Sequence, residues 1–254
     1  MQIESGKKVY FLSDFHLGIP DHKSSLTREK RIVSFLESIK KETAVLFIVG
    51  DLFDFWFEYR KVIPKGYVRI LGKLAELRDA GIEIHFFVGN HDMWMSGYFE
   101  QELNIPVYYE PKLFEFNGKR FLVGHGDGLG PGDYGYKLLK KIFRNPVCKW
   151  LFSLLPPFFG IGLASVMSKG SRSVTGETDA QFLGEDKEWL IIYCREQLKQ
   201  DSYDYFVFGH RHLPIDFKLS SASRYINLGD WIRYYTYAVF DGTSMTLNSH
   251  VNEI

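Results

Sequence analysis

The stretch Ala44–Asp51, AVLFIVGD, runs through six apolar residues and then ends in glycine and aspartate. A strand that is apolar at every position has both faces buried, as in a parallel sheet covered on both sides. The segments on either side, Leu26–Lys41 and Val68–Ala80, carry apolar residues at helical spacing. Two further apolar runs, at Lys8–Ser13 and Ile82–Val88, extend this alternation of strands and helices. The pattern predicts βαβ units and a buried α/β sheet that is parallel in the first half of the chain.

The second half of the chain has short strands and tight turns. Asn117-Gly118 and Asp241-Gly242 are typical of hairpin turns. A helix-rich segment is expected over roughly residues 132–199, with short strands before and after it. We therefore predict one domain over residues 1–254, built from two packed sheets with flanking helices, and a helical insertion at residues 132–180.

The composition limits the classes of partner and compartment. The 254 residues include 31 basic and 31 acidic side chains, a net charge of zero, which argues against a general nucleic-acid binder because phosphate binding needs excess Lys and Arg. Cys148 and Cys194 cannot build a disulfide framework and fit a reducing compartment. Residues Met1–Tyr10 lack the apolar region of a signal peptide. Two adjacent prolines and later glycines break the apolar stretch Trp150–Ser168, which therefore predicts two short helices rather than a membrane span.

Five short polar motifs stand at the ends of predicted strands. Ligands of open α/β sheets collect at the carboxyl ends of strands, so the five motifs are expected to meet at one place. Each motif alone also fits a helix cap, a turn or a surface loop, but together they contain five of the eight histidines. The motifs are DFH at Asp14–His16, GD at Gly50-Asp51, GNHD at Gly89–Asp92, GHGD at Gly124–Asp127 and GHRH at Gly209–His212.

The motifs supply two carboxylates, one amide oxygen and four imidazoles. This mixture suits Mn²⁺, Fe or Zn²⁺ and holds too much nitrogen for Ca²⁺ or Mg²⁺. Seven ligands are too many for one ion, but two ions that share one carboxylate would have four each. Two such ions ~3.5–4 Å apart can activate water and stabilise both oxygens of an in-line displacement at phosphorus. The candidate ligands are Asp14, His16, Asp51, Asn90, His125, His210 and His212.

These five blocks resemble the pattern D-x-H…GD…GNH[DE]…GH…GHxH of the calcineurin-like metallophosphoesterases. The resemblance implies a four-layer αββα sandwich and two transition-metal ions, with manganese expected and iron or zinc as alternatives. It implies that His91 stabilises the developing phosphoryl charge or protonates the leaving oxygen, and that Asp92 orients His91. It also divides the ligands into one set of Asp14, His16, Asp51 and His212 and a second set of Asp51, Asn90, His125 and His210.

Longer stretches are similar to the UDP-2,3-diacylglucosamine pyrophosphatases of lipid A synthesis. They are SDFHLG at Ser13–Gly18, GDLFDFW at Gly50–Trp56 and HGDGLGPGDYGY at His125–Tyr136. That resemblance implies a nucleotide-linked glycolipid substrate that is cleaved to UMP and 2,3-diacylglucosamine 1-phosphate. The best-known members of this family have arginine where this chain has His91, and lysines of the family are not matched in Val174–Asp179.

The family's substrate contacts carry over to several positions. Trp56 either flanks the pocket or serves as a core or rim aromatic, and Arg172 is placed to meet phosphate. The other implied contacts are Asn90, His91, Asp133, Tyr136, Ser171 and His210.

The charges of the chain are distributed unevenly between the insertion and the remainder. Residues 134–176 carry seven bases and no acid, which leaves 24 bases and 31 acids, or −7, in the remainder. Bases that flank an apolar helical pair suit an element at an anionic membrane surface, or a lid over acyl chains; a helical hairpin packed on the domain is the plain alternative. We expect a cytoplasmic enzyme on the inner face of the membrane, with no nucleic-acid or obligate protein partner. A phosphoesterase for a soluble nucleotide and a non-catalytic scaffold are the competing interpretations.

Overall fold

The computed structural model describes residues 1–132, 134–160, 162 and 181–250. Its first sheet contains four parallel strands and, at one edge, two more strands, of which the inner one runs antiparallel to both of its neighbours. The strand order is β11 (Met245–Ser249), β10 (Thr236–Phe240), β1 (Lys8–Leu12), β2 (Thr43–Val49), β3 (Glu83–Phe87) and β4 (Val107–Tyr108).

The second sheet has a parallel centre and antiparallel edges. Strands β6, β7 and β9 run parallel, while β5 and β8 pair antiparallel to their neighbours. The order is β5 (Lys112–Phe116), β6 (Lys119–Gly124), β7 (Tyr205–Phe208), β9 (Arg224–Leu228) and β8 (Pro214–Lys218).

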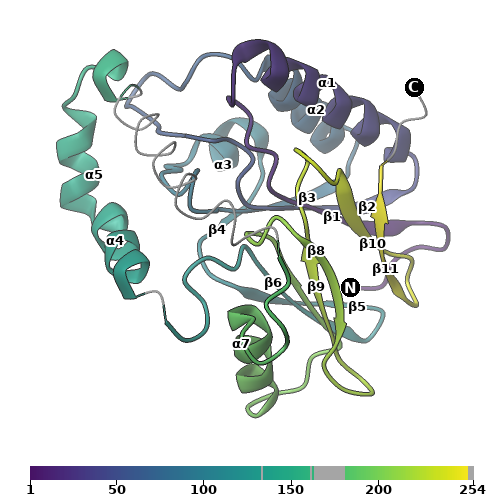
Figure 1. Ribbon diagram of the computed structural model, residues 1–254. Helices are drawn as coiled ribbons and strands as arrows, with labels where there is room; N and C mark the ends of the chain where they lie inside the picture. The colour runs from purple at the N-terminus through teal and green to yellow at the C-terminus, as the bar shows by residue number, and fades with distance from the viewer. Residues whose placement is uncertain (133, 161, 163–180, 251–254) are drawn as a thin grey trace.

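Helices cover the outer face of each sheet, which gives four layers (Figure 1). Strand β1 shows why: Val9 and Phe11 join the core between the sheets, while Tyr10 and Leu12 join the core under the helices. This continuous burial of β1 accounts for its apolar sequence and confirms the predicted αββα sandwich. Helices α1 (His22–Ile39), α2 (Val68–Asp79) and α3 (Tyr98–Leu103) lie on the first sheet, and α7 (Trp189–Leu198) lies on the second.

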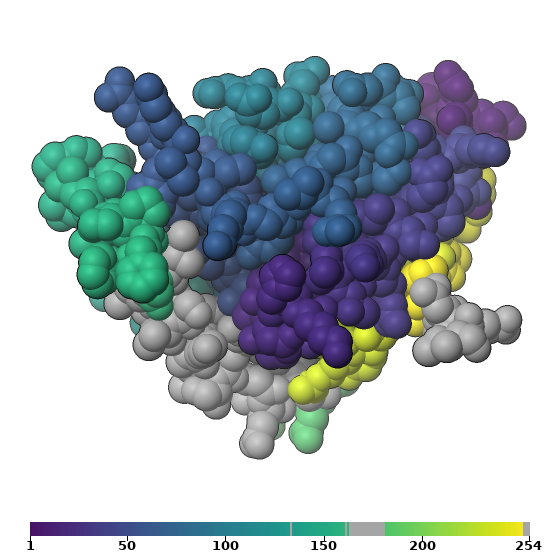
Figure 2. All heavy atoms as spheres, turned by 90° about the horizontal axis from the view of Figure 1, so that it is seen from above, coloured from purple at the N-terminus to yellow at the C-terminus, as the bar shows by residue number. Residues whose placement is uncertain are grey.

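The described part of the insertion begins with two helices, α4 (Tyr134–Arg144) and α5 (Pro146–Ser153), beside the layers (Figure 1). Asn145 caps α5 by accepting the amide hydrogen of Val147 at 2.8 Å. Figure 2 shows α4 and α5 at one edge of the molecule, and the ring of Phe152 lies 4.6 Å from that of Trp94 on the body. Among the described residues, no helix is long and apolar enough to cross a membrane.

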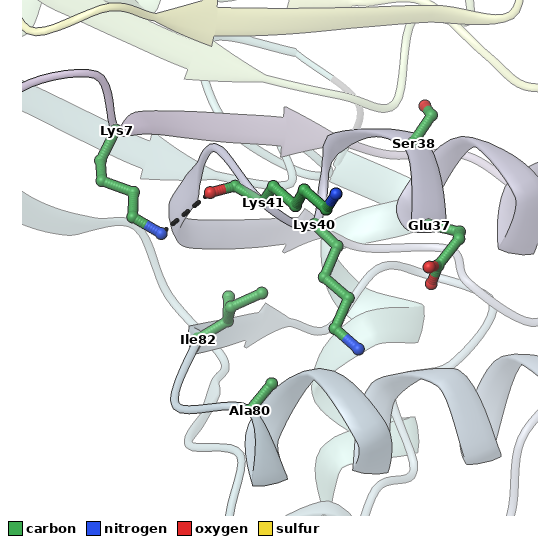
Figure 3. Close-up of a pocket in the computed structure, with 7 residues that line it drawn as sticks. All are labelled: Lys7, Glu37, Ser38, Lys40, Lys41, Ala80 and Ile82. Atoms are coloured by element: carbon green, nitrogen blue, oxygen red, sulfur yellow. Dashed lines mark hydrogen bonds between the residues drawn. The ribbon is translucent and has the colours of Figure 1, made fainter.

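A surface cavity of about 590 Å³ lies at the amino ends of β1–β3, between α1 and α2 (Figure 3). Lys7, Lys40 and Ile82 line it, and the ammonium of Lys40 pairs with Glu76 at 2.5 Å. This is the edge opposite the polar motifs, because each motif follows the carboxyl end of its strand. The cavity therefore plays no part in the candidate site.

Candidate metal centre and active site

The polar motifs occupy the loops that follow β1, β2, β3, β6 and β7. Backbone hydrogen bonds join these loops: the amide of Asp14 donates to the carbonyl of Gly50 at 3.1 Å, and the amide of His16 donates to that of Asp51 at 2.9 Å. Across the second sheet, the amide of Gly209 donates to the carbonyl of His125 at 2.9 Å. The strand ends of both sheets thus meet at one site, as the sequence predicts.

One group of four predicted ligands faces a common point. The Nε2 atoms of His16 and His212 are 3.2 Å apart, and Nε2 of His212 is 3.4 Å from Oδ1 of Asp14. Nε2 of His16 is 3.6 Å from Oδ2 of Asp51. These four ligand atoms all lie within 4.8 Å of one another.

The other predicted ligands form a second group that shares Asp51. Nε2 of His125 lies 3.4 Å from Oδ2 of Asp51 and 3.2 Å from Oδ1 of Asn90. Oδ1 of Asn90 is 2.9 Å from Nδ1 of His210. Ligand atoms about 2.0–2.2 Å from one tetrahedral ion are about 3.3–3.6 Å apart. The distances of 3.2, 3.4 and 3.6 Å in the first group are close to this spacing, while Asn90 and His210 in the second group stand closer, at 2.9 Å. Oδ2 of Asp51 lies between them, where a bridging ligand belongs.

The buried carboxylates of Asp14 and Asp51 each have one oxygen that accepts a backbone amide and one left over. The amide of His210 donates to Oδ2 of Asp14 at 3.0 Å, and the amide of His91 donates to Oδ1 of Asp51 at 2.9 Å. Within the described part of the chain, Oδ1 of Asp14 and Oδ2 of Asp51 are buried without a hydrogen-bond donor. A buried anionic oxygen without a partner is costly, so a divalent cation fits both positions.

The charges of the site also favour cations. Burial alone would lower the pKa of His125, yet the carboxylate of Asp51 raises it to about 10. The pKa of His16 is also raised to about 10, because Asp14 and Asp54 outweigh burial. Burial and the charge of His125 lower the pKa of His210 to about 4, which keeps this imidazole in the neutral form that binds metal.

The backbone at the site is strained. In the described ranges nine non-glycine residues have a positive φ, and five of these are predicted ligands: Asp14, His16, Asp51, His210 and His212. Such conformations cluster where function requires them. At Gly50, with φ of 87°, a β-carbon would overlap the ring of His125, so glycine is required there by both conformation and space.

The structure gives His91 and Asp92 separate partners. Nδ1 of His91 lies 3.1 Å from the backbone oxygen of Asp54. The carboxylate of Asp92 accepts from the amides of Gly89 at 2.7 Å and Leu52 at 2.9 Å. Asp92 thus ties the loops after β2 and β3 together, and the backbone oxygen of Asp54 faces His91; the orientation of His91 by Asp92 stays a prediction. Burial and the charge of Asp51 raise the pKa of Asp92 to about 7.

The other predicted contacts fall in three places. Trp56 is fully buried, stacks on Phe53 and donates to Glu58 at 3.0 Å, so it takes the core role rather than a place in the pocket. The hydroxyl of Tyr136 donates to Asp127 at 2.6 Å, which ties α4 to the loop that carries His125. Asp133, Ser171 and Arg172 lie outside the described residues.

Asp230 is a neighbour of the site that the motif analysis missed. Its Oδ2 lies 3.5 Å from Nδ1 of His212, and its Oδ1 accepts the amide hydrogen of Arg233 at 2.7 Å. Gly229-Asp230 follows β9 as Gly50-Asp51 follows β2. The same signal, a glycine and an aspartate after a buried strand, would have identified it.

A buried ion pair anchors the GHRH loop. The guanidinium of Arg211 donates to both carboxylate oxygens of Glu188, from Nε at 3.0 Å and from Nη2 at 2.9 Å, and both side chains are fully buried. Arg211 also lies over the ring of Trp189, 4.7 Å from its centre. The pair joins the loop that carries His210 and His212 to the start of α7.

Replacing Arg211 by leucine is expected to lower the free energy of unfolding by about 3–5 kcal/mol, because Glu188 would remain buried without its partner. Urea unfolding followed by circular dichroism measures this loss. Arg195→Leu is the matched control, since Arg195 pairs with Glu185 at the surface, where such pairs contribute about 0–1 kcal/mol. Equal losses in the two variants would contradict the anchoring role of the buried pair.

The chain belongs to the calcineurin-like phosphoesterases, a class of metal-dependent hydrolases: the profile of that family matches residues 7–214, which confirms the family resemblance. A protein of Porphyromonas gingivalis named UDP-2,3-diacylglucosamine hydrolase is 40% identical, over 95% of this chain and 97% of that protein. A protein of the same name from Aeromonas salmonicida is 30% identical, over 87% of this chain and 85% of its own. A solved archaeal phosphodiesterase, 13% identical, aligns with 95% of this chain and 98% of its own at a TM-score of 0.48.

Proposed function

We propose that the protein is a dinuclear, Mn²⁺-dependent hydrolase that cleaves the diphosphate of UDP-2,3-diacylglucosamine to UMP and 2,3-diacylglucosamine 1-phosphate. The observation that carries the proposal is the meeting of seven donor residues in two groups that share Oδ2 of Asp51. The name and nearly equal length of the Porphyromonas gingivalis relative support the choice of substrate.

The seven donor side chains would hold two ions, the first through His16 and His212 and the second through His125 and His210, with Asp51 between them. When bound, the ions supply Lewis acidity to the phosphoryl oxygens and make a water nucleophilic. Backbone contacts of the chain fix the orientation of the candidate ligand rings. For example, the carbonyl of Val49 lies 2.8 Å from Nδ1 of His125, so Nε2 of that ring faces the site. His91 would give a proton or a hydrogen bond to the leaving oxygen from Nε2, since its Nδ1 faces Asp54.

The insertion supports the lipid part of the proposal through its apolar surface. Helices α4 and α5 and the residues after them expose large side chains, with Leu154 60% and Phe158 83% exposed. Three bases of α4 contact the body: Lys137 donates to the carbonyl of Gly130, Lys140 pairs with Asp127, and Arg144 pairs with Glu110. We infer that these bases anchor the insertion, while its apolar side chains meet the cytoplasmic face of the membrane or the acyl chains.

The double substitution Leu154→Gln and Phe158→Gln is expected to weaken binding to anionic phospholipid vesicles at least about tenfold, because each buried side chain of this size contributes about 1.5–3 kcal/mol. Co-sedimentation with phosphatidylglycerol vesicles measures the change. Val68→Gln is the control, since Val68 is 73% exposed on α2, away from the insertion. Vesicle binding that the double substitution leaves intact would contradict the membrane contact.

The substrate is tested by incubating the purified protein with Mn²⁺ and UDP-2,3-diacylglucosamine in detergent micelles and separating the nucleotides by chromatography. We expect release of UMP, and much slower turnover of a UDP-sugar without acyl chains. Cleavage of a generic phosphodiester without release of UMP would support a phosphoesterase activity and would contradict the glycolipid substrate. Equal turnover of the acylated and the soluble UDP-sugar would favour the soluble-nucleotide alternative.

A further inference from the structure

The segment that follows the insertion, residues 181–188, is fastened to the GHRH loop by the buried Arg211–Glu188 pair. Nη2 of Arg211 donates to the carbonyl of Gln181 at 2.8 Å as well as to Oε1 of Glu188 at 2.9 Å. The amide of Leu183 donates to the same Oε1 at 2.9 Å. Glu188 is the N-cap residue of α7. The pair therefore joins the GHRH loop, the chain that returns from the insertion and the start of α7 at one buried point.

The chain that enters the insertion is attached to the loop of another predicted ligand, His125. Asp127, two residues after His125, pairs with Lys140 of α4 at 2.6 Å. At Gly130 a β-carbon would lie only 2.5 Å from the carbonyl oxygen of Trp189, the first residue of α7. Both ends of the insertion therefore lie against the start of α7 and against loops that carry predicted ligands.

Backbone contacts connect this attachment to the predicted ligands themselves. The amide of Arg211 donates to the carbonyl of Gly209 at 2.8 Å, and the amide of Gly209 donates to the carbonyl of His125. His210 and His212, on either side of Arg211, have φ of 69° and 51°. Left-handed backbone at residues other than glycine persists only where the surrounding contacts hold it. Because the side chain between these two residues is bound in the ion pair, the pair is placed to hold both of them.

Stability alone is a weak explanation for a buried ion pair. The cost of removing two charges from water offsets most of their attraction, so an apolar pair of similar volume often stabilises a protein equally well or better. An ion pair also fixes direction, which an apolar pair does not. Here the planar guanidinium meets both oxygens of one carboxylate and the carbonyl of Gln181. This geometry favours a role in positioning.

We propose that the Arg211–Glu188 pair positions His210 and His212 and couples their arrangement to the ends of the insertion. Arg211 is thus a positioning residue of the metal centre, and the coupling suits a substrate that contacts the insertion and the ions together. The proposal rests on the proposed function, in which a glycolipid diphosphate is such a substrate. Because coupling between two sites is reciprocal, binding of metal at the ligands should also order residues 181–188.

The substitution Arg211→Lys keeps the charge and removes the planar guanidinium. We expect the affinity for Mn²⁺, measured by titration calorimetry, to fall about 10–100-fold, the range for contacts that support metal ligands. Arg195→Lys is the matched control, because Arg195 belongs to α7 and pairs with Glu185 at the surface. Ile39→Ala controls for lost stability, since Ile39 is buried at the end of α1, at the edge opposite the site. Normal Mn²⁺ affinity in Arg211→Lys would overturn the proposal.

A double substitution separates positioning from stability. Arg211→Leu together with Glu188→Leu replaces the ion pair by an apolar pair, so the free energy of unfolding should recover most of the loss that Arg211→Leu alone causes. The affinity for Mn²⁺ should stay low, because leucine cannot bind the carbonyl of Gln181 or fix the direction of the loop. Recovery of both quantities would mean that the pair serves stability only, and the positioning role would be refuted.

Hydrogen exchange followed by mass spectrometry tests the coupling without any substrate. In the parent, addition of Mn²⁺ should slow the exchange of the amides in residues 181–188, and Arg211→Lys should lose this response. Exchange in these residues that Mn²⁺ leaves unchanged in the parent would contradict the coupling. Neither this measurement nor the Mn²⁺ titration needs a lipid, so both are independent of the release of UMP, whose absence would instead contradict the proposed substrate.

Discussion

Asp51→Ala is expected to abolish turnover and to reduce the bound Mn²⁺ below two ions per chain. The reason is that Oδ2 of Asp51 lies within 3.6 Å of His16 and within 3.4 Å of His125, so its removal takes a ligand from both groups. The same change removes the acceptor for the amide of His91. Initial rates at saturating substrate, together with metal analysis of the dialysed protein, measure both effects.

The control for Asp51→Ala is Asp79→Ala, which removes an exposed carboxylate from the end of α2 and should leave both quantities unchanged. Asp51→Ala protein that is folded by circular dichroism and still turns over at a measurable fraction of the parent rate would contradict a bridging role. Retention of two ions with loss of turnover would also contradict it, because the defect would then lie outside metal binding.

His91→Ala is expected to slow kcat by about 10²–10⁴-fold, the range for loss of a general acid, while both Mn²⁺ ions stay bound. The ring of His91 lies near the predicted ligands and is not among them: the amide of His91 donates to Asp51, and its Nδ1 faces the backbone oxygen of Asp54. Alanine keeps the amide, so the metal site should survive the substitution. Steady-state kinetics and metal analysis separate the two effects.

His22→Ala serves as the control for the loss of an imidazole, since His22 is exposed at the start of α1. Full activity in His91→Ala would show that His91 takes no part in the reaction. Loss of bound metal in that variant would show instead that His91 supports the ligands.

The sequence predicted the meeting of the seven candidate ligands because each follows a buried strand. In both sheets the strands that carry ligands run parallel, so their carboxyl ends share one edge. That argument needs only apolar runs and the polar residues after them, which are local features. It also predicted the four layers, since a strand such as β1 must be covered on both faces.

The contacts behind the ligands could not be predicted, because they depend on the path of the loops. Asp54 and Asp92 are both aspartates near a motif, and only the structure shows that Oδ1 of Asp54 lies 3.6 Å from Nδ1 of His91 while Asp92 accepts the amides of Gly89 and Leu52. The Arg211–Glu188 pair joins residues 23 apart in sequence across the start of α7. The motif pattern specifies the types of the candidate ligands and does not specify such second contacts.

The central claim, a glycolipid diphosphatase that works with two ions, is tested most directly by adding Mn²⁺ in steps to metal-free protein while the release of UMP from UDP-2,3-diacylglucosamine is followed. The account predicts that release rises with added metal and reaches its full rate at two equivalents per chain. Full release at one equivalent, or no release of UMP once two ions are bound, would contradict it.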